Sequence, residues 1–186
     1  DQGFAIDIRQ HPTRDTTELT IYAPDHPGLF AQIAGAIALG SASIVDAKII
    51  TLSNSMALDV FQIQDLTGHA LRNDDRLVRL KERLERSIVG ELRLDQELRE
   101  FRRRASAVKP QRLFNVPTRV IFDNKASANH TIIEVNGRDR VAFLYDVTAT
   151  LTNLGLQIFS AHISTYGERV VDVFYVKDVF GLQIEH

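Results

Sequence analysis

The chain has 186 residues, with 22 Lys and Arg against 24 Asp and Glu, a formal net charge of −2 and no cysteine. This length suits one large domain or two small ones, and the lack of cysteine excludes disulfides, thiolate nucleophiles and cysteine metal sites while fitting a reducing cytoplasm. Because no apolar run approaches the ~20 residues of a membrane helix, we expect neither a membrane span nor a secretory signal.

The first elements predicted along the chain are two strands and a helix. Phe4–Ile8 and Glu18–Ala23 show the alternation of strands, and the turn Asp25–Gly28 follows them. The next segment places apolar side chains at helical spacing, and we expect Gly40 to end this helix in the left-handed conformation. The apolar stripe of this helix consists of Phe30, Ile33 and Ile37.

A hairpin and a long helical segment come next. Ile44–Leu52 is predicted to pair with Ala57–Gln64 across the turn Ser53–Ser55. Asp74–Arg104 has helical spacing on both sides of Gly90, where we expect a break. The two helical stripes are Leu77, Leu80, Leu84 and Ile88, then Leu94, Leu98 and Phe101.

The remaining segments repeat this order after a linker. The helix of the second set has a stripe at Leu144, Val147, Leu151 and Leu154, and we expect Gly155 to end it in the left-handed conformation. The other expected elements are the linker Lys109–Pro117, the strands Thr118–Asp123 and Thr131–Val135, and a hairpin of Ile158–Tyr166 with Val170–Lys177 across Gly167–Arg169.

The chain is therefore duplicated. Asp25 and Asp139 lie 114 positions apart, as do many apolar pairs, and an Asp-Val-Phe tripeptide recurs at Asp59 and Asp172 after a one-residue slip. The pattern predicts an α+β fold of two tandem βαββαβ sandwiches, residues 1–112 and 113–186, the second truncated before its last helix. We expect the chain to be a fragment of a longer protein. The pattern leaves open whether the copies pack side by side, which strand completes each sheet, and whether the chain forms a homodimer.

Nothing in the sequence indicates catalysis. There is no Gly-rich phosphate loop, nucleophile elbow or HExxH helix, and the six histidines lack the spacing of metal ligands, so we expect no cofactor or metal in this chain. His162 is read as a half-buried or interface histidine. The segment Arg72–Arg112 holds 13 basic and 8 acidic residues, which we read as a solvated helix face. Without interleaved aromatic residues it does not indicate nucleic-acid binding.

The turn before the first helix is the candidate ligand site. Pro27 presets φ at the helix entry, Gly28 permits close approach to the backbone, and the helix N-terminus suits an anionic group such as an amino-acid carboxylate. Asp25 offers an acceptor for an ammonium or amide group. The alternative is that Asp25 caps the helix and the Pro-Gly pair only shapes the turn. Asp59 and Asp172 are read as structural carboxylates. The candidate ligand-binding residues of the first copy are Asp25, His26, Pro27, Gly28, Leu29, Phe30, Ser43 and Asp46.

The strand, D-x-P-G-L turn, helix and hairpin resemble the ACT domain, a ferredoxin-like regulatory module. More narrowly, Ile33–Ile49, Leu113–Asn124 and Ser160–Gly181 are similar to the C-terminal tandem ACT region of the bacterial PII uridylyltransferase/uridylyl-removing enzyme family. The resemblance covers almost the whole chain. It implies that the ligand-binding loop comprises Asp25, Pro27, Gly28 and Leu29 in the first copy, with Asp139 as the candidate ligand-binding residue of the second. Where the family's loop has a Pro-Gly pair, the second copy has Val141-Ala142, and the added β-carbon of alanine disfavours positive φ or close approach there.

The resemblance implies a glutamine-sensing role in nitrogen regulation. Upstream catalytic domains, which use Mg²⁺ in that family, would add UMP to protein PII or remove it, and this region would control them allosterically from the cytoplasm. Its partners would be glutamine or another small amino acid, those catalytic domains and, through them, PII. Another reading is a ligand-free module that joins domains or subunits. A third reading, a free-standing enzyme, would require catalytic motifs that the sequence lacks.

Overall fold

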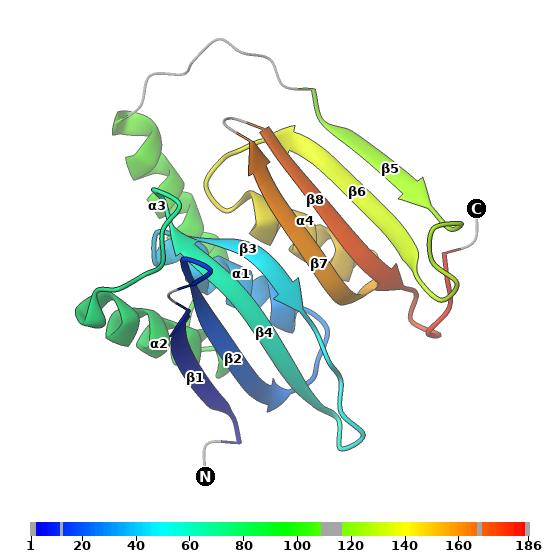
Figure 1. Ribbon diagram of the computed structural model, residues 1–186, viewed down its shortest axis with the longest axis horizontal. Helices are drawn as coiled ribbons and strands as arrows, with labels where there is room; N and C mark the ends of the chain where they lie inside the picture. The colour runs from blue at the N-terminus through cyan, green and yellow to red at the C-terminus, as the bar shows by residue number, and fades with distance from the viewer. Residues whose placement is uncertain (1–2, 12, 109–116, 167–168, 185–186) are drawn as a thin grey trace.

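The computed structural model describes residues 3–11, 13–108, 117–166 and 169–184, and it contains one eight-stranded antiparallel sheet with helices against one face (Figure 1). The repeat seen in the sequence is also a structural repeat. The first copy consists of β1 (Ala5–His11), β2 (Thr16–Pro24), α1 (Leu29–Leu39), β3 (Ala42–Lys48), β4 (Met56–Asp65), α2 (Asp74–Ile88) and α3 (Leu94–Val108). The second consists of β5 (Arg119–Asp123), β6 (Thr131–Arg138), α4 (Phe143–Asn153), β7 (Gln157–Tyr166) and β8 (Arg169–Lys177).

The strand order, β1-β2-β4-β3-β7-β8-β6-β5, confirms the predicted α+β fold. Each copy contributes four neighbouring strands in the order expected of a ferredoxin-like sheet, with its helix-connected strands separated by one strand. The outer strands β1 and β5 each precede the strand–helix–hairpin unit of their own copy. The question of which strand completes each sheet is thereby answered within this chain.

The two copies pack side by side through strands β3 and β7. Asp46 lies opposite His162, Ala47 opposite Ala161, and the backbone N–H of Ile49 donates to the carbonyl of Phe159 at 3.1 Å. Helices α1 and α4 are in contact on the covered face of the same seam. The seam between the copies therefore consists of a continuous hydrogen-bonded sheet with a helix pair behind it.

The alternation of the strands directs alternate side chains into a common core. On β4, for example, Ala57, Phe61 and Ile63 are buried against the helices. The predicted stripe of α1 is confirmed because all three of its residues are 7% exposed or less. Phe30 meets Phe61 edge-on, with ring centroids 5.4 Å apart. Burial of these apolar side chains is the main stabilising term for such a sandwich.

Two predictions from the sequence are wrong: Gly40 does not end α1 in the left-handed conformation, and Leu154 is not part of the buried stripe of α4. Gly40 has φ −78°, and the left-handed residue is the next one, Ser41, at φ 56°. Gly155 does take φ 78° and occupies the position that repeats Ser41. At Gly40 a β-carbon would lie 3.1 Å from the Ile37 carbonyl oxygen and from Leu80, so close helix packing explains the glycine. Leu154 is 69% exposed because α4 ends one residue before it.

The long basic segment forms two helices with the break where it was expected. Helix α2 ends at Ile88, Gly90 takes φ 75°, and α3 begins at Leu94. Leu80, Leu84 and Leu98 are buried, which confirms the apolar faces of both helices. The linker Lys109–Pro117, except its last residue, lies outside the described residues. The same holds for Gly167 and Glu168 of the second hairpin turn.

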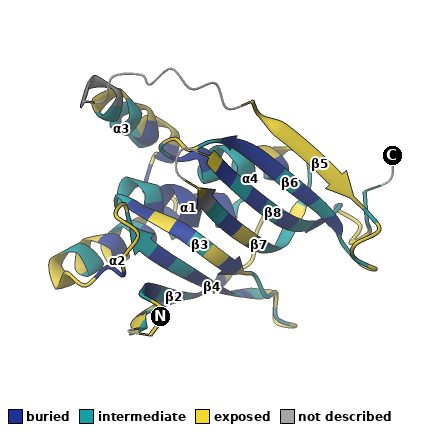
Figure 2. Ribbon diagram, turned by 45° about the horizontal axis from the view of Figure 1, so that its top comes forward, coloured by how far each residue is buried: buried dark blue, intermediate teal, exposed yellow. Residues whose placement is uncertain are grey.

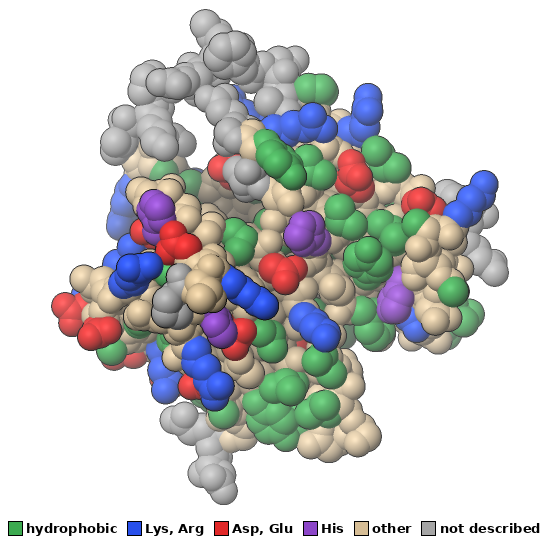
Figure 3. Space-filling model, in the orientation of Figure 1, with side chains coloured by type: hydrophobic (Ala, Val, Ile, Leu, Met, Phe, Trp, Pro, Cys, Tyr) green, Lys and Arg blue, Asp and Glu red, His purple; other side chains and the backbone are tan. Residues whose placement is uncertain are grey.

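The copies differ in how their faces are covered. In the first, α2 packs near β1, whereas every residue of β5 is exposed, as Figure 2 shows. Val120 and Phe122 are 48% and 51% exposed. The other face of the sheet, toward the viewer in Figure 3, displays a mixture of polar, charged, histidine and apolar side chains.

A candidate ligand-binding site at the seam between the two copies

The loop of the first copy leads into α1 without a capping side chain. Gly28, the residue before α1, has φ 92°, and no side chain of the described residues bonds the helix N-terminus there. Asp25 instead accepts a 2.7 Å hydrogen bond from the hydroxyl of Thr51. The ring Nδ1 of His26 lies 3.0 Å from the carbonyl oxygen of Pro27. Asp25 is therefore not the helix cap. The N–H of Leu29 donates to the carbonyl of His26 at 3.2 Å, and an anionic group could complement the rest of this helix N-terminus.

This loop faces the second copy. A β-carbon built on Gly28 would lie 3.7 Å from the side-chain methyl group of Thr152 on α4. Leu29 and Phe30 anchor the loop because both side chains are buried in the core, whereas Asp25, His26 and Pro27 are exposed. The outward part of the loop is thus held in place against the seam.

The loop of the second copy has the same backbone form. Ala142, the residue before α4, takes φ 58°, which confirms that the position requires a positive φ and that alanine occupies it with strain. A small cavity of about 80 Å³ lies beside this loop and is lined by both copies. Its lining includes Ala42, Ser43 and Ile44 from the first copy with Asp139, Ala142 and Asp172 from the second.

A buried carboxyl group lies beneath each loop. Asp59 and Asp172 are each 1% exposed, and one oxygen of each has no hydrogen-bond partner among the described residues. Burial raises the pKa of Asp59 to about 7, with the Asp25 carboxylate adding to the rise and the Ile50 N–H opposing it. Burial likewise raises the pKa of Asp172 to about 7, the Ser164 N–H opposes this, and Asp139 adds to it.

Such orphaned buried carboxyl oxygens are costly in a folded protein, and the same cost is repeated in both copies. A cationic or hydrogen-bond-donating ligand would satisfy them. The arrangement at each loop therefore combines an acceptor for an ammonium or amide group with a helix N-terminus for a carboxylate.

Helix α3 covers the second loop. The guanidinium of Arg102 donates to the carbonyls of Val141 at 3.1 Å and Ala142 at 3.2 Å, and to the carboxylate of Asp146 at 2.8 Å. Arg140 from the loop pairs with the same carboxylate. Leu92, Leu94 and Leu98 form an apolar cluster with Ala142.

A second polar contact fastens α3 to α4. The hydroxyl of Tyr145 donates to Asp95 at 2.6 Å. Burial and this carboxylate together raise the pKa of Tyr145 to about 12. Through these contacts α3, which belongs to the first copy in sequence, holds the loop of the second.

The structure distributes the predicted site residues over two loops and two faces. Asp25–Phe30 form one loop, and Ser43 lies across the seam beside Asp139 at the other. Asp46 lies on the opposite face of the sheet, where its carboxylate is 3.5 Å from Nδ1 of His162. His162 is at the seam, as the interface reading predicts, and is exposed rather than half-buried.

The sequence reading missed the two buried carboxyl groups and Arg102 as parts of the site. The alternation on β4 could have identified the first carboxyl, because Asp59 is two positions from each of the core residues Ala57 and Phe61 and so lies on the same face of the strand. No comparable signal exists for Arg102, whose partners are 39 to 44 positions away.

Comparison with known proteins agrees with this architecture. The model of the N-terminal ACT domain of the ACR family matches residues 126–186. The bifunctional uridylyltransferase/uridylyl-removing enzymes of Azospirillum brasilense and Rhodospirillum rubrum are each 50% identical to the chain, over 100% and 98% of its length. The enzyme of Gluconobacter oxydans is 50% identical over 93%. The chain is a tandem ACT-domain region homologous to part of these enzymes.

This ACT-domain region spans about a fifth of the length of those relatives, 20%, 19% and 18% respectively. ACT domains are regulatory modules, so the assignment implies a regulatory role. Among the described residues, no group of three His, Asp or Glu side chains is placed to hold a metal ion. None of the described helices is long and apolar enough to cross a membrane.

Proposed function

We propose that this ACT-domain region is an allosteric sensor that binds a small amino acid, with glutamine as the favoured ligand, at the seam between its two copies. In a longer protein it would control the uridylylation and deuridylylation of PII by upstream catalytic domains. The names of the relatives support this assignment of activities. A cytoplasmic location is part of the proposal.

The observation that carries the proposal is the orphaned carboxyl oxygen of Asp59 beneath an uncapped helix N-terminus. An α-amino acid has an ammonium group for the carboxyl and a carboxylate for the helix end, so one ligand complements both features. Asp25 supplies a second carboxylate beside the first. The loop of the first copy is the better-equipped site because Gly28 takes its positive φ without strain and is less covered than Ala142.

A ligand at the seam has a direct route to a regulatory effect. The seam contains the β3–β7 pairing and the α1–α4 contact, and α3 links both copies. Glutamine would shift the parent's activity through a difference in affinity between two arrangements of these elements. A tenfold difference would correspond to about 1.4 kcal/mol of coupling free energy.

Isothermal titration with L-glutamine tests the proposal, and Asp59→Asn provides the decisive variant. We expect saturable binding at pH 8 that is at least about tenfold weaker in Asp59→Asn, because a charge-assisted hydrogen bond is lost. Asp46→Asn is the matched control, since this carboxylate lies on the opposite face. No heat at millimolar glutamine, or an equal loss in both variants, would contradict the proposal.

The contacts of α3 favour a second candidate function, a ligand-free module that joins domains or subunits. Arg102 already occupies the carbonyls of the second loop, and Ala142 is packed under α3. In that case amino acids would leave the chain unaffected, and Gly28→Ala would change stability alone. The same titration distinguishes the two functions.

A further inference from the structure

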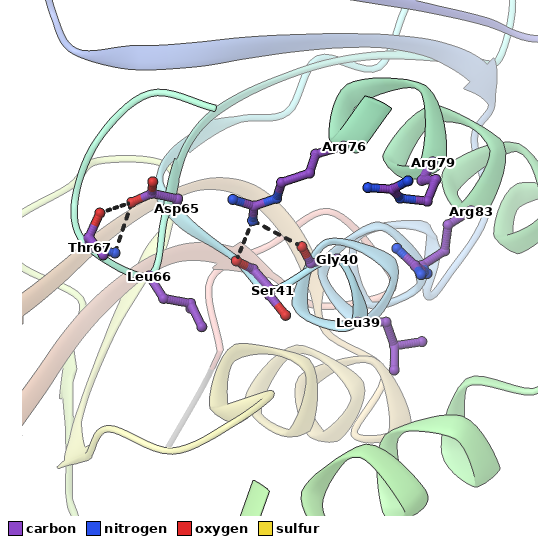
Figure 4. A pocket seen from close by; sticks show the side chains of 9 residues that line it. All are labelled: Leu39, Gly40, Ser41, Asp65, Leu66, Thr67, Arg76, Arg79 and Arg83. Atoms are coloured by element: carbon purple, nitrogen blue, oxygen red, sulfur yellow. Dashed lines mark hydrogen bonds between the residues drawn. The ribbon is translucent and has the colours of Figure 1, made fainter. Parts of the chain in front are cut away.

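An open pocket of about 480 Å³ lies on the first copy beside the end of α1 (Figure 4). It is bounded by the end of α1, by one face of α2 and by the turn after β4. Three arginines of α2, Arg76, Arg79 and Arg83, project toward it in Figure 4. Their spacing of three and four residues places them on one helix face.

The three arginines are not equally engaged. Arg76 donates to the carbonyls of Gly40 at 3.4 Å and Ser41 at 3.2 Å, and so satisfies the end of α1. No ion pair within the described ranges reaches Arg79 or Arg83. The guanidinium groups of Arg79 and Arg83 therefore face the pocket without an ion pair to any carboxylate of the described residues.

The electrostatic surroundings of Arg83 would favour a bound anion. Burial lowers the pKa of its guanidinium, and the neighbouring Arg86 and Arg79 lower it further, while Glu97 on α3 opposes the shift. A partly buried cation among like charges is stabilised when an anion binds beside it.

Asp65, the acidic residue that lines the pocket, accepts hydrogen bonds from its own turn. Asp65 Oδ1 accepts hydrogen bonds from the Thr67 hydroxyl at 2.6 Å, the Thr67 N–H at 2.8 Å and the His69 N–H at 3.1 Å. These bonds, that of the Thr67 hydroxyl first, lower the pKa of Asp65 to about 2. Figure 4 shows the two hydrogen bonds from Thr67, on the side of the pocket away from Arg79 and Arg83.

We propose that this pocket binds a small organic phosphate, with its phosphate group between Arg79 and Arg83. Guanidinium groups match the oxygens of phosphate in a bidentate manner, and two of them one helical turn apart can share a dianion. The volume exceeds that of a phosphate ion and falls within the range of small-molecule sites.

The walls of the pocket indicate an organic part to the ligand. Leu39 and Leu66 flank the arginines, and Leu66 is 71% exposed. Such a side chain can cover an apolar or aromatic group attached to the phosphate. The inference is independent of amino-acid binding, because the pocket shares no residue with either loop.

Isothermal titration of the chain in phosphate-free buffer tests the inference, with pyrophosphate, adenosine 5′-diphosphate and succinate as probes. We expect saturable binding of both phosphates, with the nucleotide binding more tightly, and no comparable binding of succinate. In Arg79→Gln with Arg83→Gln, affinity should fall at least about tenfold, because two charge-assisted contacts are lost. Leu66→Ser should remove only the advantage of the nucleotide.

The matched control is Lys81→Gln with Arg103→Gln, which removes the same charge from exposed positions on α2 and α3. It should leave each affinity within about twofold. An equal loss in both double variants, or the absence of saturable binding in the wild-type chain, would overturn the site. Succinate binding as tightly as pyrophosphate would overturn the phosphate assignment. A nucleotide that binds no better than pyrophosphate would overturn the organic part.

Discussion

The two loops at the seam have the same backbone form and different surroundings. Gly28 and Ala142 both precede a helix in the left-handed conformation, and both loops lie above a buried carboxyl with a pKa of about 7. In the first copy the loop surface is exposed, whereas Arg102 and the leucines of α3 cover the second. Duplication has thus kept the buried carboxyl groups and changed what surrounds the loop above each of them.

This difference shows how two copies of one unit can take separate roles. Under the proposed function, the exposed first loop would receive the ligand, and the covered second loop would pass its effect on through α3. The buried carboxyl groups are the feature that the two loops share, so their removal tests the similarity, and changes around α3 and Gly28 test the difference.

The largest expected effect is from neutralising the buried carboxyls. The pKa of about 7 in the folded state exceeds the ordinary aspartate pKa of 3.8, so the native state binds an additional proton between these values. Stability should therefore fall as pH rises from about 4 to about 7. Asp59→Asn and Asp172→Asn should each raise the free energy of unfolding at pH 8 by up to about 4 kcal/mol.

Urea unfolding at pH 4 and pH 8 measures this effect. The variants should gain at pH 8 and approach the wild-type chain at pH 4, where both carboxyls are protonated. Equal shifts at the two pH values would show that packing, and not ionisation, causes the change. A clear inequality between the two variants at pH 8 would end the argument that the copies share this chemistry.

The next effect concerns the cover of the second loop. Arg102→Gln removes hydrogen bonds to two carbonyls and one carboxylate, so we expect a loss of about 2 kcal/mol in the free energy of unfolding. Arg103→Gln, an exposed neighbour on α3, should change it by less than about 0.5 kcal/mol. Thermal unfolding of both variants checks this, and equal losses would remove Arg102 from its assigned role.

A smaller effect distinguishes the residues before the two helices. Gly28→Ala places a β-carbon at φ 92° and should cost about 1–2 kcal/mol. The reverse change, Ala142→Gly, relieves the backbone strain. It also removes a buried methyl group and gives the unfolded chain more conformational freedom, which is lost on folding. We expect its net effect to lie within about 1 kcal/mol of zero. Denaturant unfolding of both variants measures this difference. Equal losses in the free energy of unfolding would mean that the two loops do not differ at this position.

The smallest effect is expected from removing the hydrogen bond between Tyr145 on α4 and Asp95 on α3. Tyr145→Phe removes the hydroxyl that donates to Asp95 and should cost about 1 kcal/mol. The double variant with Arg102→Gln should show whether the two contacts act together, because coupled contacts deviate from additivity. Strict additivity in thermal unfolding would indicate that α3 is held by independent contacts.

Most of the fold follows from local patterns in the sequence. Alternation on strands such as β4 and helical spacing in α1 predict elements whose type and order the structure confirms. The break at Gly90 was also predictable, because glycine ends a helix without steric cost. These signals are local, so they depend on few other residues.

The association of the copies could not be predicted in this way. The pairing of β3 with β7 depends on the partners of two strand edges, which alternation does not specify. The error at Gly40 has a similar cause, because Leu80 from another helix explains that glycine better than its backbone conformation does.

The candidate site was predictable only in part. The loop Asp25–Phe30 could be found from its turn residues, and Asp59 could be found because it alternates with the core residues of β4 and so lies on their face. The position of Ser43 beside the opposite loop and the reach of Arg102 required the tertiary structure. The arginine pocket was read as a solvated face because spacing alone does not show which element faces α2.

Hydrogen–deuterium exchange of the chain with and without L-glutamine tests the central claim most directly, because it locates binding on one loop or the other. Glutamine should slow exchange in residues 25–32 and at Ile50, because the N–H of Ile50 donates a hydrogen bond to the carboxyl of Asp59. Smaller changes are expected at residues 139–146. Protection confined to residues 139–146, or no protection at saturating glutamine, would contradict the assignment of the first loop as the ligand-binding one.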